Sequence, residues 1–192
     1  MKDSDIRKVI LSDLGREFEN DPDTMIIEEL GLCQGEARVD IAVVNGSIHG
    51  FEIKSNQDTL KRLAGQAEIY SRVLASITLV VGSEHLDEAL RIIPKWWGVI
   101  VAKETSGQMH LKKRRNGKLN PGLDPFSLVQ LLWRDEAFSA LKKHDLHQGL
   151  ASKPRTVLWK KLAEHLPTDE LLALVRSFIK SRGSWRSGYQ QA

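Results

Sequence analysis

The sequence has a single cysteine, Cys33, few aromatic residues and no long apolar run. One cysteine excludes an internal disulfide and a cysteine-rich zinc site, and it fits a reducing compartment. No apolar run approaches the ~18 residues that cross a bilayer, and the charged first ten residues lack the apolar core of a signal peptide. We therefore expect a soluble cytoplasmic protein without a membrane partner.

The composition indicates a folded chain with an uneven distribution of charge. Of its 192 residues, 41% are apolar and 28% are charged, which predicts one globular domain with, at most, a small appendage. Residues 1–107 hold 12 Lys and Arg against 18 Asp and Glu, whereas residues 108–192 hold 16 against 7. The basic part suggests a surface that binds a polyanion, and an ordinary solvated face is the alternative.

Hydropathy predicts a mixed α/β arrangement for the first half of the chain. Asn45-Gly46 lies between two apolar strands, which predicts a type I′ hairpin. Strand 76–82 is apolar on both faces, so helices should cover it on two sides through a parallel crossover. The expected elements are helix 4–19, strands 25–32, 38–44 and 47–55, helix 58–74 capped by Asp58, strand 76–82, helix 84–93 and strand 96–104.

From Gly107 onward the sequence becomes basic and then helical. Segment 109–120 is predicted to be a basic hairpin or loop that turns at Asn116-Gly117. Three helices should follow, the first capped by Asp124 with Pro125 in its first turn and ending near Lys143, the others spanning 153–166 and 168–182. We therefore expect a core, residues 1–106, and a hairpin with a helical extension, residues 107–192, that could position nucleic acid.

Three charged residues of the predicted hairpin suggest a chemical site. Glu52 and Lys54 are two residues apart in a strand and therefore share a face, and the hairpin makes Asp40 a neighbour of Glu52. Two adjacent carboxylates raise each other's pKa unless a cation compensates them. Mg²⁺ suits one or two carboxylates, retained waters and phosphate oxygens. The pattern predicts phosphodiester hydrolysis, in which Lys54 orients water or stabilises charge, and Mn²⁺ should substitute for Mg²⁺.

These residues resemble a known signature. Asp40 followed by Glu52-Ile53-Lys54 is similar to the D…(D/E)-x-K signature of the PD-(D/E)XK nuclease superfamily, and Glu52 is the only acid of the chain with Lys two positions later. Gln66 and Tyr70 resemble the Q-x-x-x-Y element of its RecB-like branch, as in small bacterial and phage proteins. The resemblance implies a restriction-endonuclease-like α-β-β-β-α-β core, a Mg²⁺-dependent DNA nuclease, and the Ile53 carbonyl as a further metal ligand.

Other interpretations of the same residues stay open. Glu52 and Lys54 could belong to an exposed cross-strand salt-bridge network that contributes little stability, and Tyr70 could belong to the core. Members of the superfamily often add an acid from the first helix or strand. We favour Glu29 over Glu17, Glu19 and Glu28, although strand parity alone does not choose between them. A catalytically silent DNA-binding or adaptor protein with the same fold is the alternative function.

Several basic and polar residues are candidates for contact with nucleic acid, and for each the alternative is a solvated or structural role. They are Ser55, Lys61, Arg62, the tract Lys112, Lys113, Arg114 and Arg115, and the helical residues Lys153, Arg155, Lys160, Lys161, Arg176, Lys180 and Arg182, followed by Trp185 and Arg186. The expected partner is DNA, with RNA left open. A homodimer is possible, because many double-strand cutters pair two active sites.

Overall fold

The computed structural model describes residues 2–183, so Trp185 and Arg186 lie outside the described part. One mixed sheet runs through the molecule in the order β1-β2-β3-β4-β5-β6. Its strands are β1 (Met25–Leu32), β2 (Ala37–Val44), β3 (Ile48–Lys54), β4 (Ser76–Gly82), β5 (Gly98–Thr105) and β6 (Gln108–Arg115). β3, β4 and β5 are parallel, and the other neighbours are antiparallel. The predicted mixed α/β class is confirmed.

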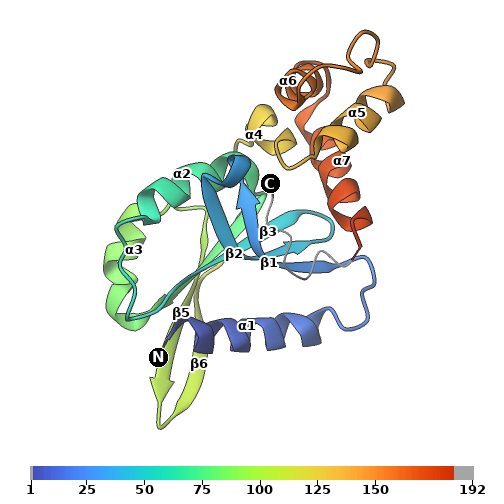
Figure 1. Ribbon diagram of the computed structural model, residues 1–192. Coiled ribbons are helices and arrows are strands. Elements are labelled where there is room, and N and C mark those ends of the chain that lie inside the picture. The colour runs from blue at the N-terminus through green and yellow to red at the C-terminus, as the bar shows by residue number, and fades with distance from the viewer. Residues whose placement is uncertain (1, 184–192) are drawn as a thin grey trace.

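Helices cover both faces of this sheet and extend past one end. They are α1 (Asp3–Glu17), α2 (Leu63–Val73), α3 (Leu86–Ile92), α4 (Pro125–Val129), α5 (Arg134–Lys143), α6 (Arg155–His165) and α7 (Thr168–Ser181). α1 lies along one face, α2 and α3 lie on the other, and α4 to α7 gather beyond α2 (Figure 1). Over residues 2–183, no helix has the length and apolar character needed to cross a membrane.

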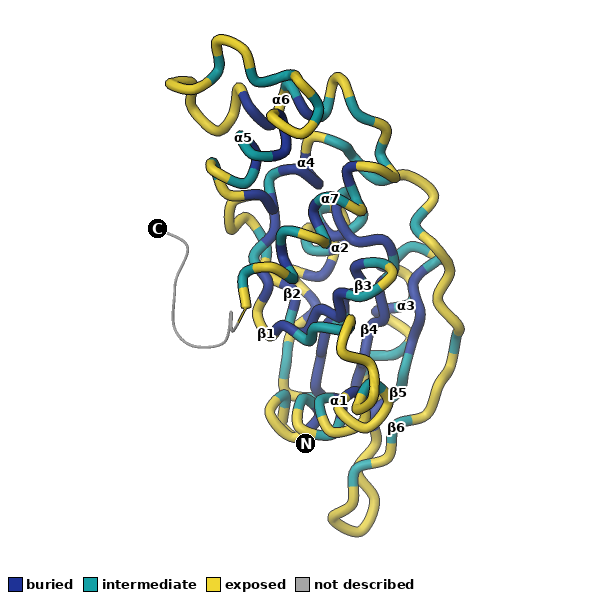
Figure 2. Tube along the Cα trace, turned by 90° about the vertical axis from the view of Figure 1, so that its right-hand side faces the viewer, coloured by how far each residue is buried: buried dark blue, intermediate teal, exposed yellow. Residues whose placement is uncertain are grey.

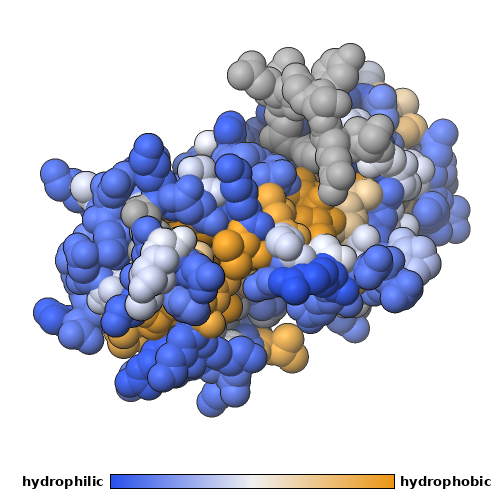
Figure 3. Space-filling model, turned by 90° about the horizontal axis from the view of Figure 1, so that it is seen from below, coloured by the Kyte–Doolittle hydropathy of each residue, from blue (hydrophilic) through white to orange (hydrophobic). Residues whose placement is uncertain are grey.

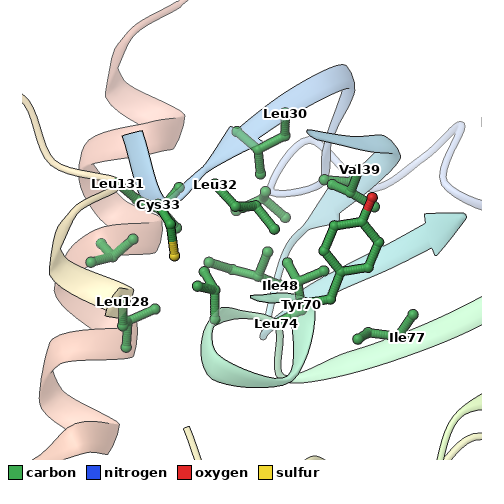
Figure 4. Packing of buried hydrophobic residues seen from close by; sticks show 14 of the residues in the cluster. Leu30, Leu32, Cys33, Val39, Ile48, Tyr70, Leu74, Ile77, Leu128 and Leu131 are labelled. Carbon is green, nitrogen blue, oxygen red and sulfur yellow. The ribbon is translucent and has the colours of Figure 1, made fainter. Parts of the chain in front are cut away.

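The two faces bury cores of different size. On one face Ile6, Ile10 and Leu14 of α1 pack against the sheet. Because α1 is alone there, sheet residues such as Phe51 and Met109 are only partly buried, and hydrophobic surface is visible from this side (Figure 3). The larger core joins the other face of the sheet to the extension, with Leu32 and Cys33 near Leu128 and Leu131 (Figure 4).

Both predicted Asn-Gly turns differ from expectation. β2 and β3 do form an antiparallel hairpin, but residues 45–47 connect them and neither Asn45 nor Gly46 has a positive φ. The Asn45 side chain shapes this loop instead, because its Oδ1 accepts from the Ser47 N–H at 3.2 Å. The type I′ prediction is therefore wrong, while the hairpin itself is confirmed.

The basic tract belongs to the sheet. Gln108–Arg115 is strand β6, and the hairpin turns at Ser106-Gly107, both with positive φ. Asn116-Gly117 follows β6 and lies against β5, where a Cβ on Gly98 would meet the Gly117 nitrogen at 3.0 Å. The expected boundary at residue 106 falls in the β5–β6 turn, so the change from sheet to helices comes only after Arg115.

Two helix boundaries also move. α2 begins at Leu63 rather than near Asp58, because the Asp58 carboxylate accepts from the Ser55 N–H and hydroxyl at 2.7 and 2.6 Å instead of capping a helix. The single helix expected up to Lys143 is divided into α4 and α5. Its predicted start is confirmed, since Asp124 accepts from the Ser127 N–H at 2.7 Å.

Candidate functional site

The candidate site begins where β2 and β3 separate. Their pairing ends at Ile41 and Phe51. Asp40 precedes Ile41 in β2, and its carboxylate accepts from the Ile53 N–H at 2.7 Å. The Asp40 side chain thus replaces the backbone acceptor that continued pairing with β2 would have given to Ile53. The N–H and C=O of a strand residue point to the same side, so the Ile53 carbonyl also faces this gap. The predicted proximity of Asp40 to β3 is thus present.

Glu52 and Lys54 face away from α1 and are buried. Their residues are 1% and 6% exposed, and the Lys54 ammonium forms an ion pair with the Glu52 carboxylate. Ile53 points into the core under α1, as its position between them predicts. A buried ion pair is retained at a large desolvation cost, so the exposed salt bridge considered above does not describe this pair.

Gln66 and Tyr70 of α2 complete the surroundings of Glu52. The Gln66 amide donates to Glu52 at 2.8 Å, and the Tyr70 hydroxyl donates to the other carboxylate oxygen at 2.7 Å. Tyr70 also packs in the large core, so its structural and site contacts coexist. The Gln66 Oε1 is buried and has no hydrogen-bond partner among the described residues. This acceptor therefore remains available beside the carboxylate.

Arg7 of α1 is the residue that the sequence did not single out. Its guanidinium donates to the Asp40 carbonyl at 3.0 Å and to the Asp40 carboxylate at 2.8 Å. It also pairs with Glu29 at 2.9 Å. An i, i+4 contact with Asp3 at 3.3 Å orients it. No local motif marks such a residue, because its role depends on how α1 packs beneath the first strands.

The position of α1 also separates the four N-terminal acids. Glu29 and Asp40 lie between the pairs Glu28–Ile41 and Leu30–Val39 of the β1–β2 ladder, and Glu28 is 3.9 Å from the Arg7 guanidinium. Glu17, the last residue of α1, lies ~15 Å along the helix from Arg7, and Glu19 follows the end of the helix; both are exposed. Of the four candidates, the fold therefore brings Glu29 and Glu28 to the Asp40 side of the site.

The electrostatics of Asp40 are unusual for an acid. Burial, followed by the charge of Glu52, raises the pKa of Asp40 to about 7, although the Ile53 N–H and Arg7 oppose the shift. Burial and the Glu52 charge also raise the pKa of Tyr70, so its hydroxyl stays a donor. Burial lowers the pKa of Arg7, but the charges of Asp40, Asp3 and Glu29 outweigh it and raise that pKa. A further cation near Asp40 and Glu52 would favour both ionised carboxylates.

The donor set suits a hard divalent cation. Asp40, Glu52 and the Ile53 carbonyl are oxygen donors at one gap, and Mg²⁺ commonly uses one or two carboxylates while keeping several waters. Within residues 2–183, no cluster of three or more His, Cys, Asp or Glu side chains is arranged to hold a metal. A cation here would therefore depend on two carboxylates, the carbonyl and water.

The nearby candidates for nucleic-acid contact have different environments. Ser55 is buried and its hydroxyl is engaged by Asp58, so a turn-forming role is evident. Lys61 and Arg62 are exposed in the turn that precedes α2, and their side chains form no hydrogen bond or ion pair within residues 2–183. These two cations are thus free to meet a ligand.

The four residues of the basic tract on β6 do not behave alike. Lys112, Lys113 and Arg114 are exposed on an edge strand, where the tube is mostly exposed (Figure 2). Arg115 instead donates to the carbonyls of Trp97 and Pro94 at 2.7 and 3.1 Å. Its geometry makes it a structural residue, which differs from the phosphate contact that we predicted.

Most cations of the helical extension hold the helices in place. Arg176 donates to the Gly46 carbonyl, Lys180 pairs with Asp23 at 2.5 Å, and Arg155 donates to Gln34 at 2.9 Å. Arg182 donates to Glu136 and to the Leu131 carbonyl, at 2.7 Å in each case. The basic composition of these helices therefore serves docking to a large extent.

The fold and these side chains define a mixed α/β protein with a buried acid–lysine cluster where β2 and β3 part. The family described as bacteriophage P4 protein cII matches residues 1–189, and the chain belongs to this family. Protein cII of Enterobacteria phage P4 is 26% identical over 160 residues, which cover 83% of this chain and 60% of that protein. The chain thus spans about three fifths of the length of this relative.

Two solved structures are also similar. The SPO1766 protein of unknown function from Silicibacter pomeroyi has a TM-score of 0.37 and 16% identity, covering 93% of this chain and 92% of that one. Pyrococcus furiosus SfsA, solved in complex with Ca²⁺, has a TM-score of 0.34 and 17% identity, covering 59% and 62%. At these TM-scores neither likeness identifies the fold.

Proposed function

We propose that this chain is a Mg²⁺-dependent DNA nuclease with a PD-(D/E)XK-type, restriction-endonuclease-like core. The observation that carries the proposal is the convergence of Asp40 with the buried Glu52–Lys54 pair at the gap between β2 and β3. Adjacent carboxylates beside one buried ammonium suit the binding of a metal and a phosphate. The Q-x-x-x-Y pair on α2 supports it, because both side chains bond Glu52.

Each side chain has a role in this proposal. Asp40, Glu52 and the Ile53 carbonyl would hold Mg²⁺, which when bound neutralises phosphate charge and lowers the pKa of a coordinated water. Lys54 would donate to the water or to the charge that develops on the phosphate. Gln66 and Tyr70 fix the Glu52 carboxylate through their hydrogen bonds. Together they direct the reaction to the β2–β3 gap.

A cleavage assay tests this function. Supercoiled, linear and single-stranded DNA, with RNA in parallel, are incubated with Mg²⁺, Mn²⁺ or EDTA. Lys54→Ala should lower the cleavage rate by about 100-fold or more, because a charge-stabilising donor is lost. The matched control is Lys8→Ala, which alters an exposed lysine on α1. Cleavage that persists in EDTA, or that is equal in both variants, would contradict the proposal.

A second function is favoured by one observation. Glu52 is already compensated by Lys54, and Asp40 by Arg7. A compensated site also suits a protein that binds DNA without cutting it. DNA binding by fluorescence anisotropy that is unchanged by EDTA and by Lys54→Ala, with no cleavage on any substrate, would identify this catalytically silent alternative.

The exposed cations of β6, Lys112, Lys113 and Arg114, indicate where DNA would approach. One register row crosses β3 to β6 through Lys54, Val81, Val101 and Lys112. Because directly paired residues share a face, Lys112 lies on the same face of the sheet as Lys54. Triple reversal by Lys112→Glu, Lys113→Glu and Arg114→Glu should weaken DNA binding and flatten its salt dependence, since each phosphate contact contributes about one unit of slope. The comparison is Lys153→Glu, Lys160→Glu and Lys161→Glu on the extension. Greater loss in that second variant would place the DNA along the helices.

A further inference from the structure

The side chains of β1 and of β2 both change from one face of the sheet to the other at the same level. In β1, Ile27 and Leu30 face the large core although they are three residues apart, and in β2 the same holds for Val39 and Ala42. Strict alternation would place residues three apart on opposite faces. Each strand therefore has a bend, at residues 28–29 in β1 and residues 40–41 in β2. The two bends coincide, because Ile27 pairs with Ala42 and Leu30 pairs with Val39.

Glu29 and Asp40 lie inside these bends. Glu29 has φ = 57°, a left-handed conformation that is unfavourable for a residue with a Cβ. Asp40 turns its carboxylate toward the Ile53 N–H, where β2 no longer pairs with β3. An unfavourable backbone of this kind persists only where surrounding contacts hold it.

Arg7 makes the contacts that span both bends. Its guanidinium reaches the Glu29 carboxylate, the Asp40 carbonyl and the Asp40 carboxylate within 3.0 Å. A guanidinium has donors in a fixed plane, so it can satisfy three acceptors in one geometry, which a lysine cannot do. Arg7 is in turn fixed by Asp3 and by the packing of Ile6 and Ile10 on its own helix.

From this geometry we infer that Arg7 is a positioning residue of the site: it holds the paired bends so that the Asp40 carboxylate stays on the Ile53 N–H beside Glu52. The inference rests on the proposed function only for its effect on a divalent cation. With Arg7 removed, the bend is no longer held from α1, and Asp40 leaves its position relative to Glu52.

The first experiment needs no metal. Amide hydrogen exchange at Ile53 is measured by NMR in wild type, Arg7→Gln, Arg7→Lys and the control Arg16→Gln, which alters an exposed arginine on the same helix. Exchange should be about tenfold faster or more in both Arg7 variants, because the acceptor of this N–H has moved, and unchanged in Arg16→Gln. Unchanged exchange in folded Arg7→Gln and Arg7→Lys overturns the inference.

The second experiment uses the cation. Calorimetric titration with Mg²⁺ should show about tenfold weaker binding in Arg7→Gln and Arg7→Lys than in Arg16→Gln. Added methylguanidinium should restore part of the binding in Arg7→Ala but none in Asp40→Asn. Equal binding by the Arg7 variants and the control overturns the inference. If wild type binds no Mg²⁺ while Ile53 exchange responds as expected, the metal function fails and the positioning role stands.

Folding is checked by circular dichroism before each measurement. If Arg7→Gln or Arg7→Ala does not fold, Arg7→Lys carries the test, because it keeps the charge and most of the side-chain volume. In that variant unchanged Ile53 exchange overturns the inference, and faster exchange supports it.

Discussion

The two ends of β3 carry polar clusters that differ in how they are satisfied. At the beginning of the strand, His49 bonds the Ser76 and Thr78 hydroxyls at 2.8 and 2.9 Å. At its end, Glu52 and Lys54 form a buried ion pair that lies next to the acidic Asp40. The first cluster is neutral and closed, because hydroxyls can donate to or accept from either ring nitrogen.

The comparison shows what distinguishes a candidate site from a buried polar residue. Burial alone lowers the pKa of His49 to about 4, and no charge is needed near it. At the other end, burial and the charge of Glu52 raise the pKa of Asp40 to about 7 even though Arg7 lies beside it, and the Gln66 Oε1 lacks a partner among the described residues. A chemical role is therefore expected where a buried group has a perturbed pKa or lacks a hydrogen-bond partner.

The largest expected effect comes from breaking the charged end. Glu52→Ala should destabilise the fold by about 3–5 kcal/mol, because Lys54 is left buried without its partner. The double variant Glu52→Met with Lys54→Met should retain near wild-type stability, since apolar pairs often replace buried ion pairs at little cost. Urea unfolding measures both. Equal loss in the single and double variants would show that the charges are not coupled.

The neutral end should respond to pH. The pKa of His49 is about 4 in the folded chain against 6.5 ordinarily, so the unfolded chain takes up the proton first as the pH falls. The contribution of His49 to stability should therefore decline between about pH 6.5 and 4, by on the order of 3 kcal/mol. The raised pKa of Asp40 acts in the opposite direction over an overlapping range, so the His49 contribution is measured as the difference between the wild-type and His49→Gln profiles. His49→Gln should remove this decline in urea unfolding, whereas His110→Gln on exposed β6 should keep it. A profile that is unchanged in His49→Gln would contradict the assignment.

The smallest expected effect comes from one hydroxyl of the neutral end. Thr78→Val keeps the shape of a buried side chain but removes the partner of the His49 Nε2. A loss of about 1 kcal/mol in stability is expected, because a neutral hydrogen bond contributes little net free energy. Thermal melting at neutral pH measures it. A loss as large as that of Glu52→Ala would abolish the distinction between the two ends.

Strand alternation and hairpin pairing were sufficient to predict much of the site. Two residues of one strand separated by one position must share a face, and that rule correctly placed Glu52 and Lys54 together and Ile53 opposite. Antiparallel pairing correctly brought Asp40 to the same gap. These local rules hold in β3, whereas alternation fails at the bends of β1 and β2.

The features that escaped prediction depend on tertiary contacts. Arg7 acts through the packing of α1 under strands that follow it in the sequence. Asn116-Gly117 has the composition of a turn, but close packing against Gly98 is what it provides. Arg115 is one of four adjacent cations, and only the fold shows that it bonds two backbone carbonyls.

The lone thiol of the chain has a practical consequence. Cys33 is 2% exposed, and burial raises the pKa of its thiol, so it should react slowly with maleimide reagents. A cysteine introduced at exposed Gln108, beside the β5–β6 turn, would then be labelled selectively without first replacing Cys33. A fluorophore at that position would sit on the same strand as Lys112 and could report the arrival of a nucleic acid in real time.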